Sequence, residues 1–211
     1  MRKNLVLKLA IALMVPLAAP ARADNFYVTA NGGLGSTRFN QSDGDNDSSN
    51  ISGAYGGGIG YRWDTEGTFR YRAELEYSHV SANELLFSNA GIDLRENLVL
   101  ANTIAEFNTK AWVKPYAGFG IGWGRVRAQA ARNGNGQPLV DLEDSSTNAF
   151  VYQVIGGLTI APSGRFEFFA DARYLKPTGV TYVLFDNRDL TVNEVNGFGS
   201  IQGRFGVRLN F

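Results

Sequence analysis

The chain has 211 residues, including 25 glycines, 26 aromatic residues and no cysteine, and its 20 basic residues balance its 20 acidic ones. The lack of cysteine excludes disulfides, thiolate metal centres and a cysteine nucleophile, and a single histidine, His79, excludes a multi-histidine metal site. A hydrophobic content of 44% without a Gly-X-Y period excludes disordered and collagen-like chains.

Residues 1–23 are predicted to form a cleaved signal peptide. A basic start precedes an apolar run from Leu5 to Pro20, and Ala21-Arg22-Ala23 supplies the small residues that a signal peptidase reads. A retained helical anchor is the less favoured alternative, because the run is shorter than the ~20 residues that span a bilayer. Residues 24–211 then form one domain with 16 basic and 20 acidic residues. Such a balance argues against a nucleic-acid partner.

Alternation of apolar and polar residues predicts eight β-strands after the signal peptide, since every second side chain of a strand lies on one face. The stretch from Leu94 to Phe107 is ambiguous, because Leu98, Leu100 and Ile104 interrupt the alternation. The apolar faces in chain order are Phe26, Val28, Ala30 and Leu34; Tyr55, Ile59, Tyr61 and Trp63; Phe69, Tyr71, Ala73, Leu75 and Tyr77; Val99, Ala101, Thr103, Ala105 and Phe107; Ala117, Phe119, Ile121 and Trp123; Phe150, Tyr152, Val154, Leu158 and Ile160; Phe166, Phe168, Ala170, Ala172 and Tyr174; and Ile201, Gly203, Phe205, Val207, Leu209 and Phe211.

The connections between these strands alternate in length. Three are short, at 64–67, 108–112 and 161–164, and four are long and mostly polar, at 39–52, 80–93, 128–147 and 177–196. This arrangement is typical of an outer-membrane barrel. We therefore predict an all-β fold, an eight-stranded antiparallel up-and-down transmembrane β-barrel. Tyrosine and tryptophan near the ends of the apolar rows are expected to form aromatic girdles, at Tyr55, Trp63, Tyr77, Trp123, Tyr152 and Tyr174.

The polar face of the strands is expected to line the barrel interior. A soluble sandwich or a lipocalin-like barrel is less favoured, because a binding calyx needs an apolar interior. Glycine runs at 56–60 and 118–124 are expected to leave room for long arginines. A lumen filled by ion pairs is the favoured prediction, and a narrow channel for solutes or ions is the alternative. The predicted lumen residues are Arg62, Arg70, Arg72, Glu74, Glu76, Glu106, Glu167, Asp171, Arg173, Arg204 and Arg208.

Several segments resemble the small outer-membrane barrels of the porin-like and opacity-protein superfamily, relatives of the OmpA and OmpX transmembrane domains. They are Ala73-Glu74-Leu75-Glu76-Tyr77-Ser78, Lys114-Pro115-Tyr116-Ala117-Gly118-Phe119-Gly120, Tyr152-Gln153, Arg173-Tyr174 and the final strand from Gly203 to Phe211.

The resemblance implies a non-enzymatic protein of the Gram-negative outer membrane with a structural or surface-exposed role, similar to an adhesin or antigen. It also implies that Phe211 is read by the barrel assembly machinery, and that both termini lie in the periplasm. The expected partners are outer-membrane lipid and lipopolysaccharide, with a host or surface ligand on the long loops. No cofactor is expected.

His79 and Ser81 suggest a second alternative function. Both residues are expected on the lipid-facing side of one strand, and such a pair resembles the lipid A deacylases, in which the histidine activates the serine to attack an acyl ester. Glu96 or Asp93 would be the third member. The sequence departs from that family's pattern, because Ala82 separates Ser81 from Asn83.

The acidic segment from Asp43 to Asp47 resembles the start of a calcium-binding loop. An EF-hand is excluded, since Ser48 stands at the position of the required glycine and Ala54 at the position of the final glutamate. A solvated acidic loop is the simpler interpretation, with divalent-cation binding as the alternative.

Overall fold

A computed structural model describes residues 25–39, 50–63, 65–87, 90–130, 145–163, 165–178, 181–185, 192–196 and 198–211. The predicted signal peptide and the acidic segment at 43–47 lie outside these residues. Within the described part of the chain, no helix has the length and apolar character needed to cross a membrane.

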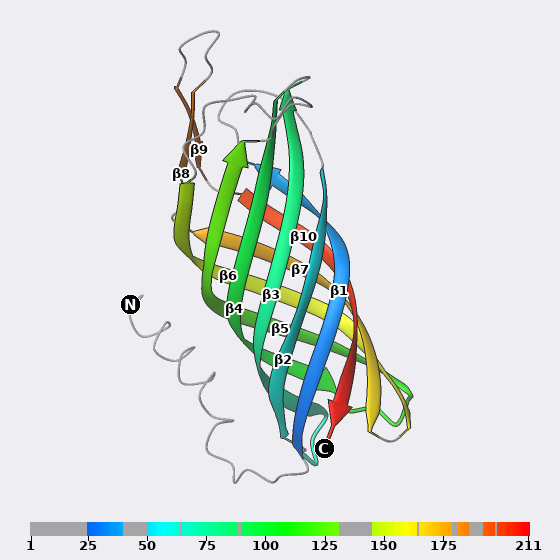
Figure 1. Cartoon of the computed structure of the whole chain (residues 1–211). Coiled ribbons are helices and arrows are strands. Elements are labelled where there is room, and N and C mark those ends of the chain that lie inside the picture. The colour runs from blue at the N-terminus through cyan, green and yellow to red at the C-terminus, as the bar shows by residue number, and fades with distance from the viewer. Residues whose placement is uncertain are drawn as a thin grey trace, which may run out of the picture.

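Eight long strands form a closed, wholly antiparallel barrel, shown in Figure 1. Going round the barrel, the order is β1-β10-β7-β6-β5-β4-β3-β2, and β10 pairs with β1 to close it. Closure pairs the backbone N–H and C=O groups of every strand edge, because the hydrocarbon of a membrane offers no water to bond them. The predicted fold class is therefore confirmed. The barrel strands are β1 (Phe26–Phe39), β2 (Asn50–Trp63), β3 (Phe69–Phe87), β4 (Ala90–Phe107), β5 (Val113–Ala130), β6 (Ser145–Ser163), β7 (Phe166–Thr178) and β10 (Phe198–Asn210).

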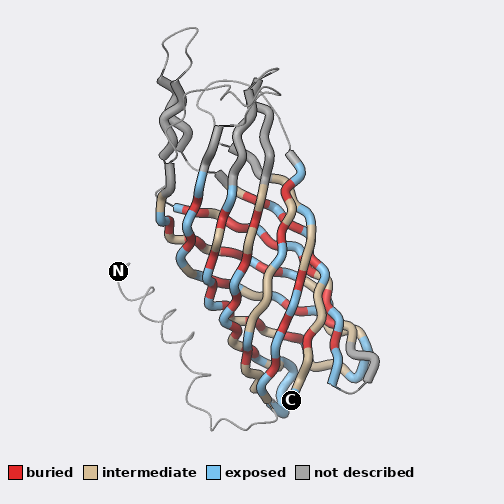
Figure 2. The backbone as a smooth tube through the Cα atoms, in the orientation of Figure 1, coloured by how far each residue is buried: buried red, intermediate tan, exposed pale blue. Residues whose placement is uncertain are grey.

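Buried and exposed residues alternate along the described parts of the barrel strands, coloured red and pale blue in Figure 2. In β7 every second residue from Glu167 to Pro177 is buried, and the residues between them are exposed or intermediate. The apolar row of β10 faces outward, and its Phe205 is 73% exposed. In the ambiguous strand β4, Val99 and Phe107 face outward while Glu106 is buried. The apolar surface of this barrel is therefore its exterior, which suits a lipid solvent.

The short connections lie at one end of the barrel, close to the C-terminus (Figure 1). β4 ends at Phe107 and β5 begins at Val113, as the sequence predicts. The same end is tied together by backbone hydrogen bonds, from Asn108 N to Thr68 O at 2.8 Å and from Phe211 N to Phe26 O at 3.0 Å. We call it the short-turn end.

The strands extend further at the opposite end than the sequence predicts. The connection expected at 80–93 is wrong, because β3 continues to Phe87 and β4 begins at Ala90. Similarly, β2 begins at Asn50, β5 continues to Ala130 and β6 begins at Ser145.

The connection expected at 177–196 contains a two-stranded antiparallel sheet. It is formed by β8 (Thr181–Phe185) and β9 (Val192–Asn196), with Tyr182 paired to Val195. In both regions, backbone pairing continues beyond the apolar band. There the outward face no longer meets lipid, so apolar and polar residues do not alternate and the sequence does not indicate a strand.

Candidate functional site: the barrel interior

All eleven residues predicted to line the lumen lie on the inward face of the strands. Arg62 and Arg70, near the short-turn end, are partly exposed, and the other nine are buried. Buried charges require partners, because an isolated ion loses its hydration. Ten of the eleven form ion pairs with one another. Glu74 is buried beside them, and the charges of Arg208, Arg173 and Arg72 act on it.

The central ion-pair network is organised around Glu76. Arg173 Nη1 donates to both carboxylate oxygens of Glu76, at 2.7 and 2.8 Å, and Arg204 Nη1 donates to Oε1 at 3.1 Å. The other nitrogens of Arg173 form a fork on Asp171, with Nε to Oδ1 at 2.8 Å and Nη2 to Oδ2 at 3.1 Å. Such bidentate, charge-assisted bonds hold both groups in a fixed geometry.

This network crosses the full width of the barrel. Glu76 lies on β3 and Arg173 on β7, and these strands stand four places apart in a ring of eight, on opposite walls. Neutral side chains connect the network to further strands. The added bonds are Asn102 to Glu76 at 2.9 Å, Gln153 to Asn102 at 2.7 Å, Tyr116 to Asp171 at 2.8 Å, Arg204 to Asn31 at 3.0 Å and Arg204 to Ser78 at 2.7 Å.

Two smaller groups of ion pairs lie closer to the short-turn end. In the first, Glu106 forms ion pairs with Arg72 at 3.2 Å and with Arg70 at 3.8 Å, and Thr159 donates a hydrogen bond to it at 2.7 Å. In the second, Glu167 accepts Arg208 at 2.6 Å and Arg62 at 3.3 Å. Aromatic rings cover two of these guanidiniums, with Arg72 5.1 Å from the Tyr116 ring centre and Arg208 5.1 Å from that of Tyr27. Rings are favourable neighbours for a desolvated cation.

Apolar side chains fill the remainder of the described interior, and alternation did not predict them. Leu98, Leu100, Val151 and Leu175 form one cluster, and each is 0% exposed. Ile104, Tyr116, Ile155 and Phe169 form a second cluster, closer to the short-turn end. The three residues that interrupt the β4 alternation therefore face inward. The interior therefore combines ion-pair groups with apolar clusters, rather than being filled by ion pairs alone.

The glycine runs make room mainly for residues other than the expected arginines. The ring of Tyr27 lies directly over Gly60, where a Cβ would overlap it. A Cβ at Gly124 would meet the Leu98 side chain, and one at Gly118 would approach Ile104 Cγ1 at 2.9 Å. These glycines allow bulky apolar and aromatic side chains to lie flat against the neighbouring strand.

The structure contradicts part of the predicted hydrolase site. His79 and Ser81 lie on the outward face as expected, but Glu96 is 0% exposed on the inward face, opposite Val80. Glu96 therefore lies on the wrong side of the sheet to orient His79. Instead, Asn97 Oδ1 accepts a hydrogen bond from His79 Nδ1 at 2.9 Å. The backbone of Asp93 pairs with Asn83, beyond the register of His79.

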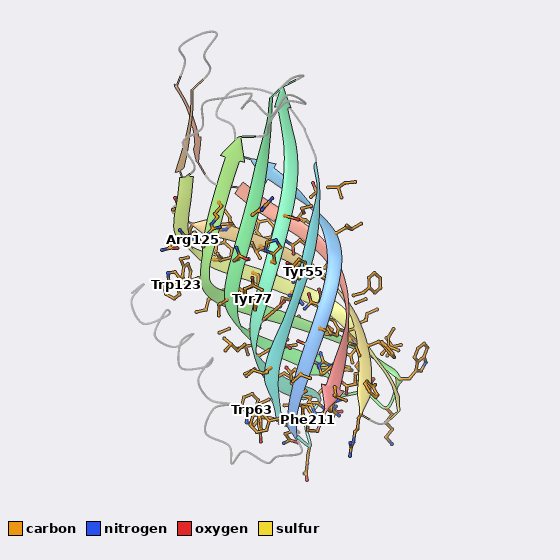
Figure 3. All side chains as sticks on the ribbon, viewed as in Figure 1. Tyr55, Trp63, Tyr77, Trp123, Arg125 and Phe211 are labelled. Carbon is orange, nitrogen blue, oxygen red and sulfur yellow. The ribbon has the colours of Figure 1, made fainter. Side chains whose placement is uncertain are left out.

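Aromatic residues stand at two levels on the outer surface. In Figure 3, Trp63 lies near Phe211 at the short-turn end, whereas Tyr77 and Trp123 lie toward the other end with Arg125 close by. Trp123 is 66% exposed, and its ring packs edge-on against Phe150 at 5.2 Å. Two such belts are expected at the two interfaces of a bilayer. Among the described residues, no group of histidine, aspartate and glutamate has the arrangement of a metal site.

Several solved structures have a similar fold. The crystal structure of Neisserial surface protein A matches with a TM-score of 0.55 and 20% identity, covering 88% of this chain and 97% of that one. Ail, the attachment invasion locus protein of Yersinia pestis, matches with a TM-score of 0.44 and 16% identity, covering 88% and 99%. The outer membrane enzyme PagL matches with a TM-score of 0.45 and 16% identity, covering 84% and 97%. These likenesses concern the fold alone.

The sequence itself gives the family. No curated protein matches the chain in sequence. The model of the family described as "Outer membrane protein beta-barrel domain" matches residues 7–208, nearly the whole length of the chain. The closed antiparallel barrel and its apolar exterior agree with that match. The chain therefore belongs to the outer membrane protein beta-barrel domain family, whose members are integral β-barrels of the Gram-negative outer membrane.

Proposed function

We propose that this protein is a structural, non-conducting barrel of the outer membrane, with a lumen sealed by side chains. The ion pair between Glu76 and Arg173 carries the proposal, because it joins opposite walls of the barrel at 2.7 Å. Asp171, Arg204 and the hydrogen-bonded residues around them occupy the space beside it. An eight-stranded barrel has an interior only wide enough for such side chains.

The energetics of the interior support a stable seal. Removing one partner of a buried ion pair costs about 3–5 kcal/mol, because the other charge is left without a partner. Separating the pair to open a path leaves both charges without a partner. The cluster of Leu98, Leu100, Val151 and Leu175 adds a second barrier, since a hydrated ion would lose its water among apolar side chains. A narrow channel, the alternative, requires both barriers to open together.

With the lumen closed, the sites for recognition of a surface partner include the segments that connect strands opposite the short-turn end. In sequence, the segments 40–49 and 131–144 are polar and rich in Asn, Asp, Ser and Gly. Function commonly resides in loops carried by a rigid scaffold. We assign surface recognition, of the adhesin or antigen kind, to these segments. The scaffold would also stiffen the membrane around it.

Solute release from liposomes tests the seal. The refolded full chain is reconstituted into vesicles loaded with a small sugar, beside protein-free vesicles and a variant with Glu76, Arg173 and Arg204 replaced by serine. Heat-modifiable gel migration verifies that each protein is folded. We expect the wild-type protein to release sugar at the protein-free rate and the folded variant to release it faster. Rapid release by the wild-type protein would show an open lumen.

A further inference from the structure

The outward face of β2 to β6 carries a polar row just beyond the aromatic belt. Strand register places Tyr55 beside His79, His79 beside Asn97, Asn97 beside Arg125, and Arg125 beside Asn148. These five residues form the first polar row. In the next row, register places Ser81 beside Arg95 and Arg95 beside Arg127. The described residues of both rows include three exposed arginines and no acidic residue.

The position of these rows coincides with the edge of the apolar band. Along β5 the outward residues are apolar from Val113 to Trp123, and Arg125 and Arg127 follow. Ten residue steps of about 3.3 Å, tilted by about 40°, rise roughly 25 Å, the height of the hydrocarbon band of such barrels. Arg125 therefore lies at headgroup level. In these barrels the short turns face the periplasm, which places the rows at the outer leaflet.

Arg95 and Arg127 stand directly opposite each other on adjacent strands, and both are exposed. Like charges in this position repel and destabilise a sheet. Arg125 is on the same face, one row closer to the membrane. A bound anion bridging these guanidiniums would turn the repulsion into attraction, and the planar fork of arginine suits phosphate oxygens.

A shallow groove on the same face has room for a sugar headgroup. Its volume is about 440 Å³, and it is lined by Asn97, Trp123, Gly124, Arg125 and Asn148. The backbone at Gly124 and the Trp123 side chain are part of this lining, and Figure 3 shows Trp123 and Arg125 near one another on the outer surface. The Asn97 side chain is held in place, because its Oδ1 also accepts the Tyr77 hydroxyl at 2.8 Å.

We propose that Arg95, Arg125 and Arg127, with Asn97 and Trp123, bind the phosphorylated sugar headgroup of a lipopolysaccharide molecule in the outer leaflet. The ligand combines phosphate, which the arginines recognise, with sugar rings that stack on tryptophan and bond to amides, and acyl chains that lie along the apolar band. A protein partner is disfavoured, because the groove lies at the level of the lipid headgroups. The site lies outside the barrel and does not depend on whether the lumen is sealed.

The test compares two charge-matched variants of the refolded full chain in detergent micelles. Arg95→Gln/Arg127→Gln removes the opposed pair, and the control Lys110→Gln/Arg165→Gln removes two exposed cations at the short-turn end. Purified bisphosphorylated lipid A is the probe, with dephosphorylated lipid A and inorganic phosphate in separate arms, and native mass spectrometry measures occupancy. We expect about 25-fold weaker binding in the first variant, roughly fivefold for each arginine, and less than twofold change in the control.

Each outcome of this test bears on the proposal. Equal lipid A binding by the two variants, or equal binding of phosphorylated and dephosphorylated lipid A by the wild type, overturns it. Full competition by inorganic phosphate would make the site one for a free anion and would also overturn it. Stability without lipid provides a second measurement. Removing the repulsion should leave the urea midpoint of the Arg95→Gln/Arg127→Gln variant equal to or above that of the wild type, and a clear fall contradicts the proposal.

Discussion

Replacing Glu76 with glutamine is expected to lower the free energy of unfolding by about 3 kcal/mol. Its carboxylate accepts bonds from Arg173, Arg204 and Asn102, and it is fully buried. An amide keeps the shape but removes the charge and directs an N–H group toward donors. Breaking a buried ion pair on one side costs about 3–5 kcal/mol. The lower end applies, because Arg173 retains its fork on Asp171.

A second substitution isolates the electrostatic part of this cost. Arg204→Met in the Glu76→Gln background restores the charge balance of the central network, leaving Arg173 paired with Asp171. The double variant should therefore be about 1–3 kcal/mol more stable than the sum of the two single effects, as is usual for groups in one network. Glu66→Gln, in an exposed turn, is the control and should change stability by less than about 0.5 kcal/mol.

Urea unfolding in lipid vesicles, monitored by tryptophan fluorescence, measures the wild-type protein and the four variants. The reasoning is refuted if the effects of Glu76→Gln and Arg204→Met simply add, since the two charges would then not depend on each other. It is equally refuted if Glu76→Gln unfolds at the same urea concentration as Glu66→Gln.

Three further variants test other parts of the structure. Leu98→Ala removes a fully buried side chain and should cost about 2–5 kcal/mol in urea unfolding; a cost near zero would mean that the cluster is loosely packed. Gly60→Ala places a methyl group against the Tyr27 ring and should cost about 1–3 kcal/mol, whereas an unchanged midpoint would contradict that contact. Deleting Phe211, whose side chain is exposed, should leave refolding in micelles intact but reduce folded protein in the outer membrane of cells, as measured by heat-modifiable migration; equal amounts in cells would exclude the assembly signal.

The fold could be predicted from sequence wherever a strand lies between lipid and a polar lumen. In β3, the outward residues from Phe69 to Tyr77 alternate with charged residues, so the sequence identifies both faces of the strand. In β10, the same alternation ends at the C-terminus and sets the register of closure. The charged residues could be assigned to the interior by parity alone, because a one-residue slip would place arginines in lipid.

Other features could not be predicted, for two physical reasons. Leu98, Leu100 and Ile104 give β4 two apolar faces, because this part of the interior is packed rather than ionic. Alternation carries no signal where both environments are apolar. The outer parts of β3 and β4, up to Phe87 and from Ala90, extend beyond the apolar band. There neither face selects for apolar residues, and only backbone pairing forms the strand.

The inward position of Glu96 follows from its parity with Glu106, so the alternation of β4 argues against this residue as the partner of His79. The burial of Leu98 and Leu100 confirms this parity, because Glu96 shares their face. The pairing of specific arginines with specific carboxylates could not be derived either. It depends on which strands stand opposite one another, as β3 and β7 do for Glu76 and Arg173.

Single-channel recording in planar lipid bilayers is the most direct measurement of whether the lumen is closed. The refolded full chain should produce no stable current steps, because the ion pair between Glu76 and Arg173 and the cluster around Leu98 occupy the interior. Reproducible steps of uniform size, absent from protein-free bilayers, would contradict this account and establish a conducting pore.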